Sequence, residues 1–430
     1  MFEKMNETKK IIKISLVFII LFIAMGIFGG NQLQASISKG EFGSLSSGKY
    51  CIVYSNIRNY DAYGIVFGEN GKQVEKLFLT QGMSDKGYLS KFEKNILLSN
   101  PEQKNNTLIT QQGKIESFDM GRTSLLENSK AGYTSISGDY AILITNNIDK
   151  DFYKEESIES EELKVSVKKG TDGETRDYVT KGQWIDSGFI YDNVLYLIVG
   201  KNLKDNQYVI EGFDLNTGEK INEAIMPIEG KNEPSPKRLA IKDNILSLAY
   251  NNKDIETVLF YNLTTMSEIK KENIVADEIF NRVAVDDLNF HISTIMKNNK
   301  HSITGKDYQY DQNLVITKTI DIVPNTVEKK EYQLKDVLIE KGKMYAFHQA
   351  YEQKTKNEEA RENFLNEIFI IIGSILGAYE GPENTSVVCV YDISTGAQLE
   401  KTTLEINDSR LQNGVMIPFL LENNKESDKW

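Results

Sequence analysis

Short runs of alternating apolar and polar residues recur along most of the chain and indicate β-strands. The clearest group lies in residues 239–274, where LAIKD, NILSLAYN, ETVLFYNL and SEIKKENI follow one another. Alternation with a period of two predicts strands with one buried face, and the pair Asp243-Asn244 between two apolar runs predicts a tight hairpin. We therefore predict four antiparallel strands in this segment, with the polar SEIKKENI as the outermost strand.

The groups on either side follow the same order. The preceding group reads SGFIYDN, VLYLIVGKN, QYVIEGFDLNTG and EKINEAIMPI, and the following one reads RVAVDDL, NFHISTIMKN, DYQYDQN and LVITKTIDIV. A turn signal between the third and fourth strands occurs seven times, at Asn70-Gly71, Gln112-Gly113, Asp172-Gly173, Thr217-Gly218, Thr264-Thr265, Gln312-Asn313 and Thr395-Gly396. The intervals from Gly218 to Thr265 and from Thr265 to Gln312 are both 47 residues, which fits the roughly 40 to 50 residues of one propeller blade. The predicted fold class is all-β, a β-propeller of about seven blades.

The two ends of the repeat array complement each other. The first group begins with GKYCIVYSN, which reads as a second strand, because the linker before it, SISKGEFGSLSS, is polar and Gly-rich. At the other end NGVMIPFLL, residues 413–421, is one strand in excess. A propeller closed by its C-terminal strand leaves no long edge unpaired. We predict that the propeller covers residues 48–421, closed in this way, and that residues 422–430 form a charged tail.

The first 35 residues read as an export or anchoring segment. Lys4, Lys9, Lys10 and Lys13 precede an apolar run from Ile14 to Phe28. Its 15 residues suit the core of a signal peptide and fall short of the roughly 20 of a comfortable membrane span, so length leaves a cleaved signal and a retained transmembrane helix both open. In both cases the positive residues stay inside and the residues after about 36 lie outside. We predict a signal peptide or membrane anchor at 1–35, a linker at 36–47 and an extracytoplasmic propeller, cell membrane-anchored or secreted.

Two insertions lengthen the repeat. One is acidic, DKDFYKEESIESEE, and the other lies in the last blade, at residues 351–385. The second predicts a helix over 352–381, charged at first and apolar nearly all round from Phe364 to Tyr379. Such a helix would cover the channel of the propeller or dock on a membrane or partner protein. The partner-docking candidates are Phe364, Ile368, Phe369, Ile371, Ile372, Ile375 and Leu376.

Charge and cysteine content narrow the possible partners. The formal net charge is −12 and no basic stripe occurs outside the N-terminus, which argues against nucleic acid as a partner. The two cysteines, Cys51 and Cys389, lie near opposite ends of the array. They could form a bridge that closes the ring in an oxidising compartment, or they are two free buried thiols.

Two turns carry a recognisable motif. Asp214-Leu215-Asn216-Thr217-Gly218 and Asp392-Ile393-Ser394-Thr395-Gly396 resemble the D-x-x-T-G turns of quinoprotein-like and related bacterial extracytoplasmic propellers. The resemblance implies a propeller in which Asp and Thr cap the turn and Gly takes a positive φ. The Trp that docks blades in the quinoprotein family is missing at the matching offset, and the WD dipeptide and the paired kelch glycines are absent as well. The resemblance therefore implies no quinone, and we assign no cofactor.

Local motifs for catalysis or metal binding are weak. The three histidines, His291, His301 and His348, fall in different predicted blades or loops without metal-ligand spacing; His291 and His348 read as strand residues in the core or on the surface. Asn147, Asp149 and Asp151 have the oxygen spacing of a calcium loop, but Phe152 and Ile158 stand where such a loop needs Gly and Glu. No nucleophile elbow, Walker loop or HExxH motif occurs. We assign no catalytic and no metal residues.

Three hypotheses for function follow. The first is a non-catalytic binding or interaction module outside the cell membrane, with an envelope or membrane protein as partner and the membrane itself engaged through the N-terminal segment. The second is an extracytoplasmic enzyme, a glycan-acting hydrolase or lyase with its site at the propeller axis. The third is an accessory subunit of a membrane complex that docks through residues 364–379. Acidic side chains and a Tyr clustered at the channel would favour the enzyme, and apolar side chains filling it would favour binding.

Overall fold

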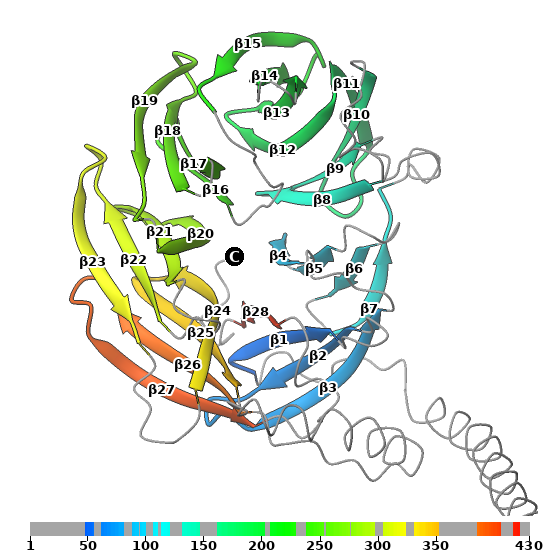
Figure 1. The fold of residues 1–430 in the computed structure, drawn as a ribbon. Coiled ribbons are helices and arrows are strands. Elements are labelled where there is room, and N and C mark those ends of the chain that lie inside the picture. Colours follow the sequence, from blue (N-terminus) through cyan, green and yellow to red (C-terminus); the bar gives the residue numbers. More distant parts are fainter. Residues whose placement is uncertain are drawn as a thin grey trace, which may run out of the picture.

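Seven four-stranded antiparallel sheets stand radially around a central axis in the computed structural model (Figure 1). This confirms the predicted all-β, seven-bladed propeller. The structure describes residues 48–55, 62–80, 88–93, 95–99, 106–110, 113–120, 131–146, 161–202, 207–228, 238–252, 255–275, 277–296, 304–323, 331–351, 385–405 and 416–421.

Each blade runs outward from the axis, beginning with its innermost strand. Blade 1 consists of β28 (Met416–Leu420), β1 (Tyr50–Ser55), β2 (Ala62–Phe67) and β3 (Gln73–Thr80). Blade 2 consists of β4 (Tyr88–Phe92), β5 (Asn95–Ser99), β6 (Asn106–Ile109) and β7 (Ile115–Phe118). Blade 3 consists of β8 (Ala131–Ser137), β9 (Tyr140–Asn146), β10 (Glu161–Lys169) and β11 (Thr175–Gly182).

The remaining four blades have the same order. Blade 4 consists of β12 (Trp184–Tyr191), β13 (Val194–Asn202), β14 (Gln207–Asp214) and β15 (Lys220–Met226). Blade 5 consists of β16 (Leu239–Lys242), β17 (Ile245–Asn252), β18 (Ile255–Asn262) and β19 (Ser267–Asn273). Blade 6 consists of β20 (Glu278–Val285), β21 (Phe290–Met296), β22 (Gly305–Tyr310) and β23 (Ile316–Ile322). Blade 7 consists of β24 (Glu331–Glu340), β25 (Lys343–Tyr351), β26 (Thr385–Asp392) and β27 (Gln398–Glu405).

The C-terminal strand closes the ring as predicted. β28 pairs antiparallel with β1, and Val53 lies opposite Ile417 in the ladder. Met416 and Ile417 are buried, and they pack into the two clusters that join blade 1 to blades 7 and 2. The first blade therefore obtains its innermost strand from the far end of the chain.

The blades are held together by apolar side chains between adjacent sheets. Between blades 4 and 5, for example, Ile198 and Ile210 pack against Leu248 and Leu259. The second and third strands of these blades read as nearly continuous buried runs, whereas the outermost strands β15 and β19 are mostly exposed. A single blade cannot bury both of its faces, so its stability comes from its neighbours.

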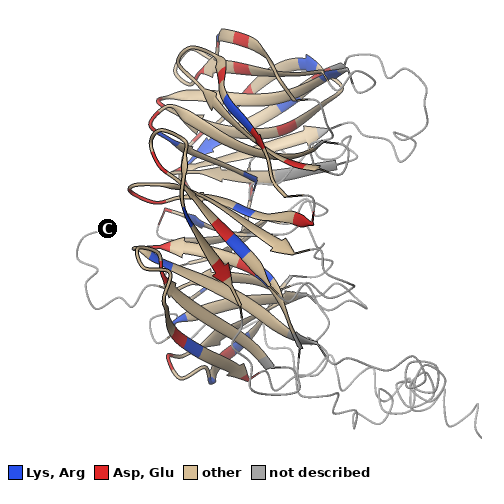
Figure 2. Ribbon diagram, turned by 60° about the vertical axis from the view of Figure 1, so that its left-hand side comes forward, with Lys and Arg blue, Asp and Glu red and all other residues tan. Residues whose placement is uncertain are grey.

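The two faces of the ring differ in their connections. The hairpins between first and second strands and between third and fourth strands lie on one face, which we call the turn face. The second-to-third connections lie on the opposite face, which we call the loop face. Both predicted insertions leave the ring there, one between β9 and β10 and the other between β25 and β26. Figure 2 shows the ring turned from the view of Figure 1.

Short turns of defined geometry make up the turn face. Asp243 and Asn244 both have positive φ, as a two-residue type I′ hairpin requires. In the D-x-x-T-G turn of blade 4, Asp214 Oδ1 accepts hydrogen bonds from the N–H groups of Asn216 and Thr217, at 2.8 Å each. Asn262 caps the turn of blade 5 in the same way, and Met266 takes the positive φ where the motif has Gly. The motif's geometry thus recurs in a blade whose sequence departs from it.

Several predicted segments lie outside the described residues. These are the export segment at 1–35, the linker at 36–47, the acidic insertion up to Ser160 with Asn147, Asp149 and Asp151, the helix at 352–381 with its docking candidates, and the tail at 422–430. In the part of the chain that the structure describes, no helix has the length and apolar character to cross a membrane.

Candidate functional site

A cavity of about 640 Å³ occupies the turn-face end of the central channel. The innermost strands of blades 1, 2, 3, 6 and 7 surround it. Its walls are mostly apolar, with Leu89, Ile136, Leu338 and Phe419 among them. Charged residues of the lining are Lys91, Arg282, Glu93, Asp139 and Glu340, and no tyrosine lines it among the described residues. The cavity is thus an apolar chamber with charged groups at particular positions.

Arg282 links this cavity to the interface between blades 6 and 7. Its Nε and Nη2 each donate to one carboxylate oxygen of Asp336 on β24, both at 3.0 Å. Asp336 is fully buried, and the backbone N–H of Val337 donates to the same carboxylate. A bidentate guanidinium is the arrangement that best compensates a buried carboxylate. The pair fixes the Arg282 side chain beside the cavity.

The face of blade 6 that meets blade 7 is polar over its first three strands. Ser293 on β21 lies opposite Asp307 on β22, and His291 lies opposite Gln309 in the adjacent row. All four side chains are buried. Gln309 Nε2 crosses to blade 7 and donates to the carbonyl of Ile393 at 3.2 Å. Most other blade interfaces have apolar side chains at these positions, so this interface is distinctive.

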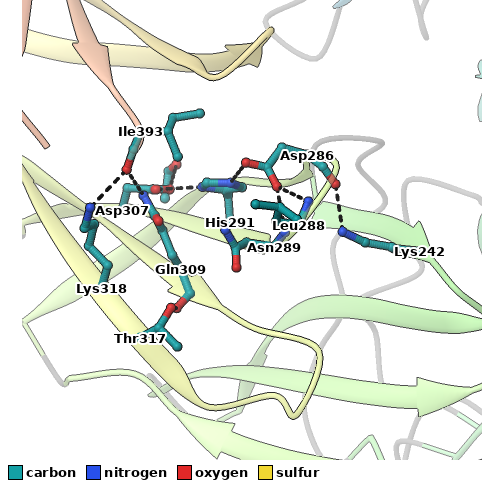
Figure 3. Close-up of polar contacts among 11 residues, drawn as sticks. Lys242, Asp286, Leu288, Asn289, His291, Asp307, Gln309, Thr317, Lys318 and Ile393 are labelled. Atoms are coloured by element: carbon teal, nitrogen blue, oxygen red, sulfur yellow. Dashed lines mark hydrogen bonds and ion pairs between the residues drawn. The ribbon is translucent and has the colours of Figure 1, made fainter. Parts of the chain in front are cut away.

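His291 lies between two carboxylates (Figure 3). Nδ1 donates to Asp307 Oδ2 at 2.8 Å, and Nε2 lies 3.1 Å from Asp286 Oδ2. Ser293 Oγ donates to the second oxygen of Asp307 at 2.9 Å. Burial alone would lower the pKa of His291, but hydrogen bonds and charge from the two carboxylates outweigh burial and raise it to about 9. The imidazole is therefore charged at neutral pH.

Asp286 ties this cluster to the turn face. Burial would raise the pKa of Asp286, but His291 and the backbone N–H groups of Asn289 and Leu288 lower it to about 2. Its carbonyl accepts a hydrogen bond from Lys242 of blade 5 at 3.0 Å. On the other side Lys318 donates to the carbonyl of Ile393 at 3.3 Å. The network therefore holds the turns of blades 5, 6 and 7 in one arrangement.

A groove of about 610 Å³ lies above this network, between blades 6 and 7. Its lining includes Leu288, Asn289, Lys318, Lys343 and Ser394. Leu288, at the tip of the turn that Asp286 caps, is 75% exposed. An exposed leucine on a turn held by a buried ionic network is a rigid apolar contact point.

Geometry argues against acid–base catalysis by His291. A general base needs a free ring nitrogen to take a proton, and both nitrogens of His291 already face carboxylates. Ser293 donates to Asp307 rather than to the imidazole. Among the described residues, no group of three or more His, Cys, Asp and Glu side chains is arranged to hold a metal ion. The chemistry that this cluster supports is charge compensation and the positioning of loops.

Three innermost strands contain a β-bulge near the axis. The ladders shift register around Asp186 in β12, Asn281 in β20 and Lys335 in β24. Burial raises the pKa of Asp186 to about 7, and burial lowers the pKa of Lys335, whose amine donates to Gln333 Oε1 at 2.7 Å. Bulges often re-aim side chains beside functional sites, and here they add polar groups to strands that surround the channel.

The residues singled out from the sequence have varied positions. His348 is fully buried on β25, and burial lowers its pKa to about 4. His301 lies outside the described residues. The prediction that His291 and His348 are strand residues holds, but the sequence did not reveal the carboxylates around His291.

The possible bridge between Cys51 and Cys389 is not formed. Both are free, buried thiols. Ile52 and Val388 pack together between blades 1 and 7. Because successive side chains of a strand point to opposite faces, Cys51 instead faces blade 2 and Cys389 faces blade 6, in separate clusters. In the structure the two thiols are free and lie in different blade interfaces.

Similarity to known proteins is confined to architecture. No family model matches the sequence, and no curated protein matches it. Among solved structures, BamB from Moraxella catarrhalis is 11% identical with a TM-score of 0.35, covering 68% of this chain and 92% of that one. Apo AztD from Citrobacter koseri is 10% identical with a TM-score of 0.41, covering 86% and 98%. A functionally unknown protein from Desulfotomaculum acetoxidans is 10% identical with a TM-score of 0.45, again covering 86% and 98%. At this distance the likeness says nothing about activity.

Proposed function

We propose that this protein is an extracytoplasmic propeller, membrane-tethered or secreted, that binds a partner on its turn face and does not catalyse a reaction there. The observation that carries the proposal is the chamber at the end of the channel, whose walls are mostly apolar and beside which three buried or half-buried carboxylates are paired with cations. Asp336 is paired with Arg282, and His291 lies between Asp286 and Asp307. A glycan-acting enzyme needs carboxylates able to exchange protons with substrate.

The location of the propeller outside the membrane and the use of its turn face for binding can be tested together in intact cells. A photo-crosslinking amino acid at Leu288 on the turn face is expected to give a discrete crosslinked product. The same amino acid at Val179, an exposed position on the outermost strand β11, serves as the control and is expected to give none. A cysteine introduced at Ser394 should react with a membrane-impermeant maleimide without lysis. Labelling only after lysis would exclude the outside location, and equal crosslinking at both positions would exclude the turn face.

A second candidate function is docking through the insertion at residues 352–381. The observation that favours it is the position of the insertion, because β25 ends at Tyr351 and β26 begins at Thr385 on the loop face. Both ends of the insertion therefore lie on the face opposite the turn face. The insertion would let the protein engage a membrane complex with one face and a second partner with the other.

Deletion of the insertion tests this candidate. Gln349 lies opposite Ser386 in the ladder, so a short Gly-Ser linker in place of 352–384 can close the hairpin. We expect an unchanged unfolding temperature and loss of association with membranes, measured by flotation of a chain that lacks residues 1–35. The matched control replaces 147–160, which also leaves from the loop face, with the same linker. Unchanged flotation of the first variant would eliminate docking through the insertion.

A further inference from the structure

Different kinds of residue line the axial cavity at different depths. The position of a residue in its β-ladder, counted from the first hairpin, measures its depth below the turn face. Arg282 lies opposite Ser293 and Leu89 lies opposite Leu98, and both residues are at the fourth position of their ladders. Ile136 and Leu338 lie at the second and third pairs of their own ladders. Glu340 forms the first pair of its ladder. The cavity thus has Arg282 at its floor, apolar walls, and an acidic residue at its rim.

Acidic residues recur around this rim. Glu93, Asp139 and Glu340 line the cavity at the first hairpins of blades 2, 3 and 7. The corresponding hairpins of blades 4, 5 and 6 carry acidic residues too, namely Asp192, Asp243 and Asp287. Figure 2 shows acidic positions at several hairpin tips of the ring. Six blades out of seven therefore place a carboxylate at the hairpin nearest the axis.

The cations near the cavity compensate only part of this charge. Arg282 is committed to Asp336 through Nε and Nη2, which leaves Lys91 as the other cation of the lining. Lys242 is directed to the carbonyl of Asp286. Asp139 is exposed, and its carboxylate has no ion-pair partner among the described residues. Lys341 and Lys343 lie at the hairpin of Glu340 and offset part of this charge as well. The cavity lining itself has three carboxylates against Lys91 and the paired Arg282, which leaves the lining net negative.

We propose that the cavity receives a peptide segment of a partner protein in which basic side chains flank apolar ones. The apolar side chains enter the chamber against Leu89, Leu338 and Phe419, and the basic ones meet the carboxylates at the rim. A small organic cation would need only one carboxylate, whereas carboxylates spread over several blades match several charges on an extended segment. This inference rests on the proposed binding function of the turn face and names the chemistry of the partner.

Binding of short synthetic peptides to the purified full-length protein tests the inference. Fluorescence anisotropy is measured with a peptide of Lys-Leu-Leu-Lys repeats, with a Lys-Ser-Ser-Lys peptide of equal charge, and with a Glu-Leu-Leu-Glu peptide. We expect saturable binding of the first, binding weaker by about tenfold or more for the second, and none for the third. Raising the salt concentration should weaken the first interaction, because Glu93 and Asp139 of the rim are exposed.

Two charge reversals on blade 3 locate the site. Asp139→Lys at the rim should lower the affinity for the Lys-Leu-Leu-Lys peptide by about tenfold. Asp172→Lys, at the outer hairpin of the same blade and face, should change this affinity by less than about twofold. Both positions are exposed, so both variants should fold, which circular dichroism verifies. Ser90→Phe fills the chamber and should also weaken binding.

Three results would overturn the inference. Equal affinity for the Leu and Ser peptides would mean that charge alone is recognised, and equal losses from the two reversals would mean that the mouth is not the site. Absence of binding by the Lys-Leu-Leu-Lys peptide would reject the partner chemistry. In that last case a crosslinked product at Leu288 would still support the turn face as a binding surface, so the two proposals fail separately.

Discussion

Removal of residues 414–430 is expected to abolish the cooperative unfolding of the propeller. The deletion takes away β28 and with it five paired residues along β1. Tyr50, Ile52 and Tyr54 are fully buried in the complete ring, and the deletion opens the chamber wall beside them. An exposed inner edge with apolar faces pairs readily with other chains. Circular dichroism during heating and size-exclusion chromatography should show a broad transition and aggregation.

A chain that ends at residue 421 is the matched control for this deletion. It keeps β28 and is expected to unfold at the temperature of the full chain. Adding the peptide NGVMIPFLL to the truncated chain should restore part of the transition, because the groove that it fills is specified by β1. A truncated chain that unfolds cooperatively at the same temperature as the control would show that closure by β28 is dispensable.

Stability should fall steeply at alkaline pH because of His291. Its pKa of about 9 in the folded protein lies above the ordinary value of 6.5, so the stabilisation from its two carboxylates is complete below about pH 6.5. This stabilisation is lost as the pH rises through 9. The shift of the pKa from 6.5 to about 9 corresponds to roughly 3 kcal/mol of unfolding free energy. The unfolding free energy measured in urea between pH 6 and 10 should decrease accordingly. His291→Gln should be less stable at pH 6 and should show a much flatter dependence.

His348 supplies a control with the opposite sign. Its pKa in the folded protein, about 4, lies below the ordinary 6.5, so its contribution is complete above pH 6.5 and is lost as the pH falls through 4. His348→Leu should therefore reduce the loss of unfolding free energy at acidic pH and leave its loss at alkaline pH unchanged. An alkaline limb that persists in His291→Gln would mean that another group titrates there.

Local patterns were sufficient to predict the architecture. Each strand shows its alternation within a few residues, and each turn between third and fourth strands has Gly, Asn, Asp or Thr at a fixed offset. Closure by residues 413–421 followed from counting strands, because a blade with three strands and a spare strand elsewhere have one common solution. The recurrence of the D-x-x-T-G geometry at Asn262 was missed, since Met266 replaces the Gly that marks the motif.

The candidate site was not predictable in the same way. Arg282 and Asp336 meet only because blades 6 and 7 pack together, and no local pattern in either strand signals the pair. Asp307 could have been found near His291 by aligning β21 with β22 across their connection, which places Ser293 opposite Asp307. The second carboxylate beside His291, that of Asp286, belongs to a four-residue turn whose conformation depends on hydrogen bonds within the turn. The cavity likewise depends on five strands that are distant in sequence.

Closure by the two ends of the chain has a consequence for biogenesis. A ribosome produces β1 before all other described strands and β28 after them, so the inner partner of β1 is missing until the rest of the described propeller has been made. If the chain crosses the membrane from its N-terminus, as its first residues predict, blade 1 is exposed outside the membrane as an incomplete sheet until translocation of the propeller is finished. Long-range pairing of this kind is slow, and we expect the newly exported protein to depend on folding helpers until its last strand arrives.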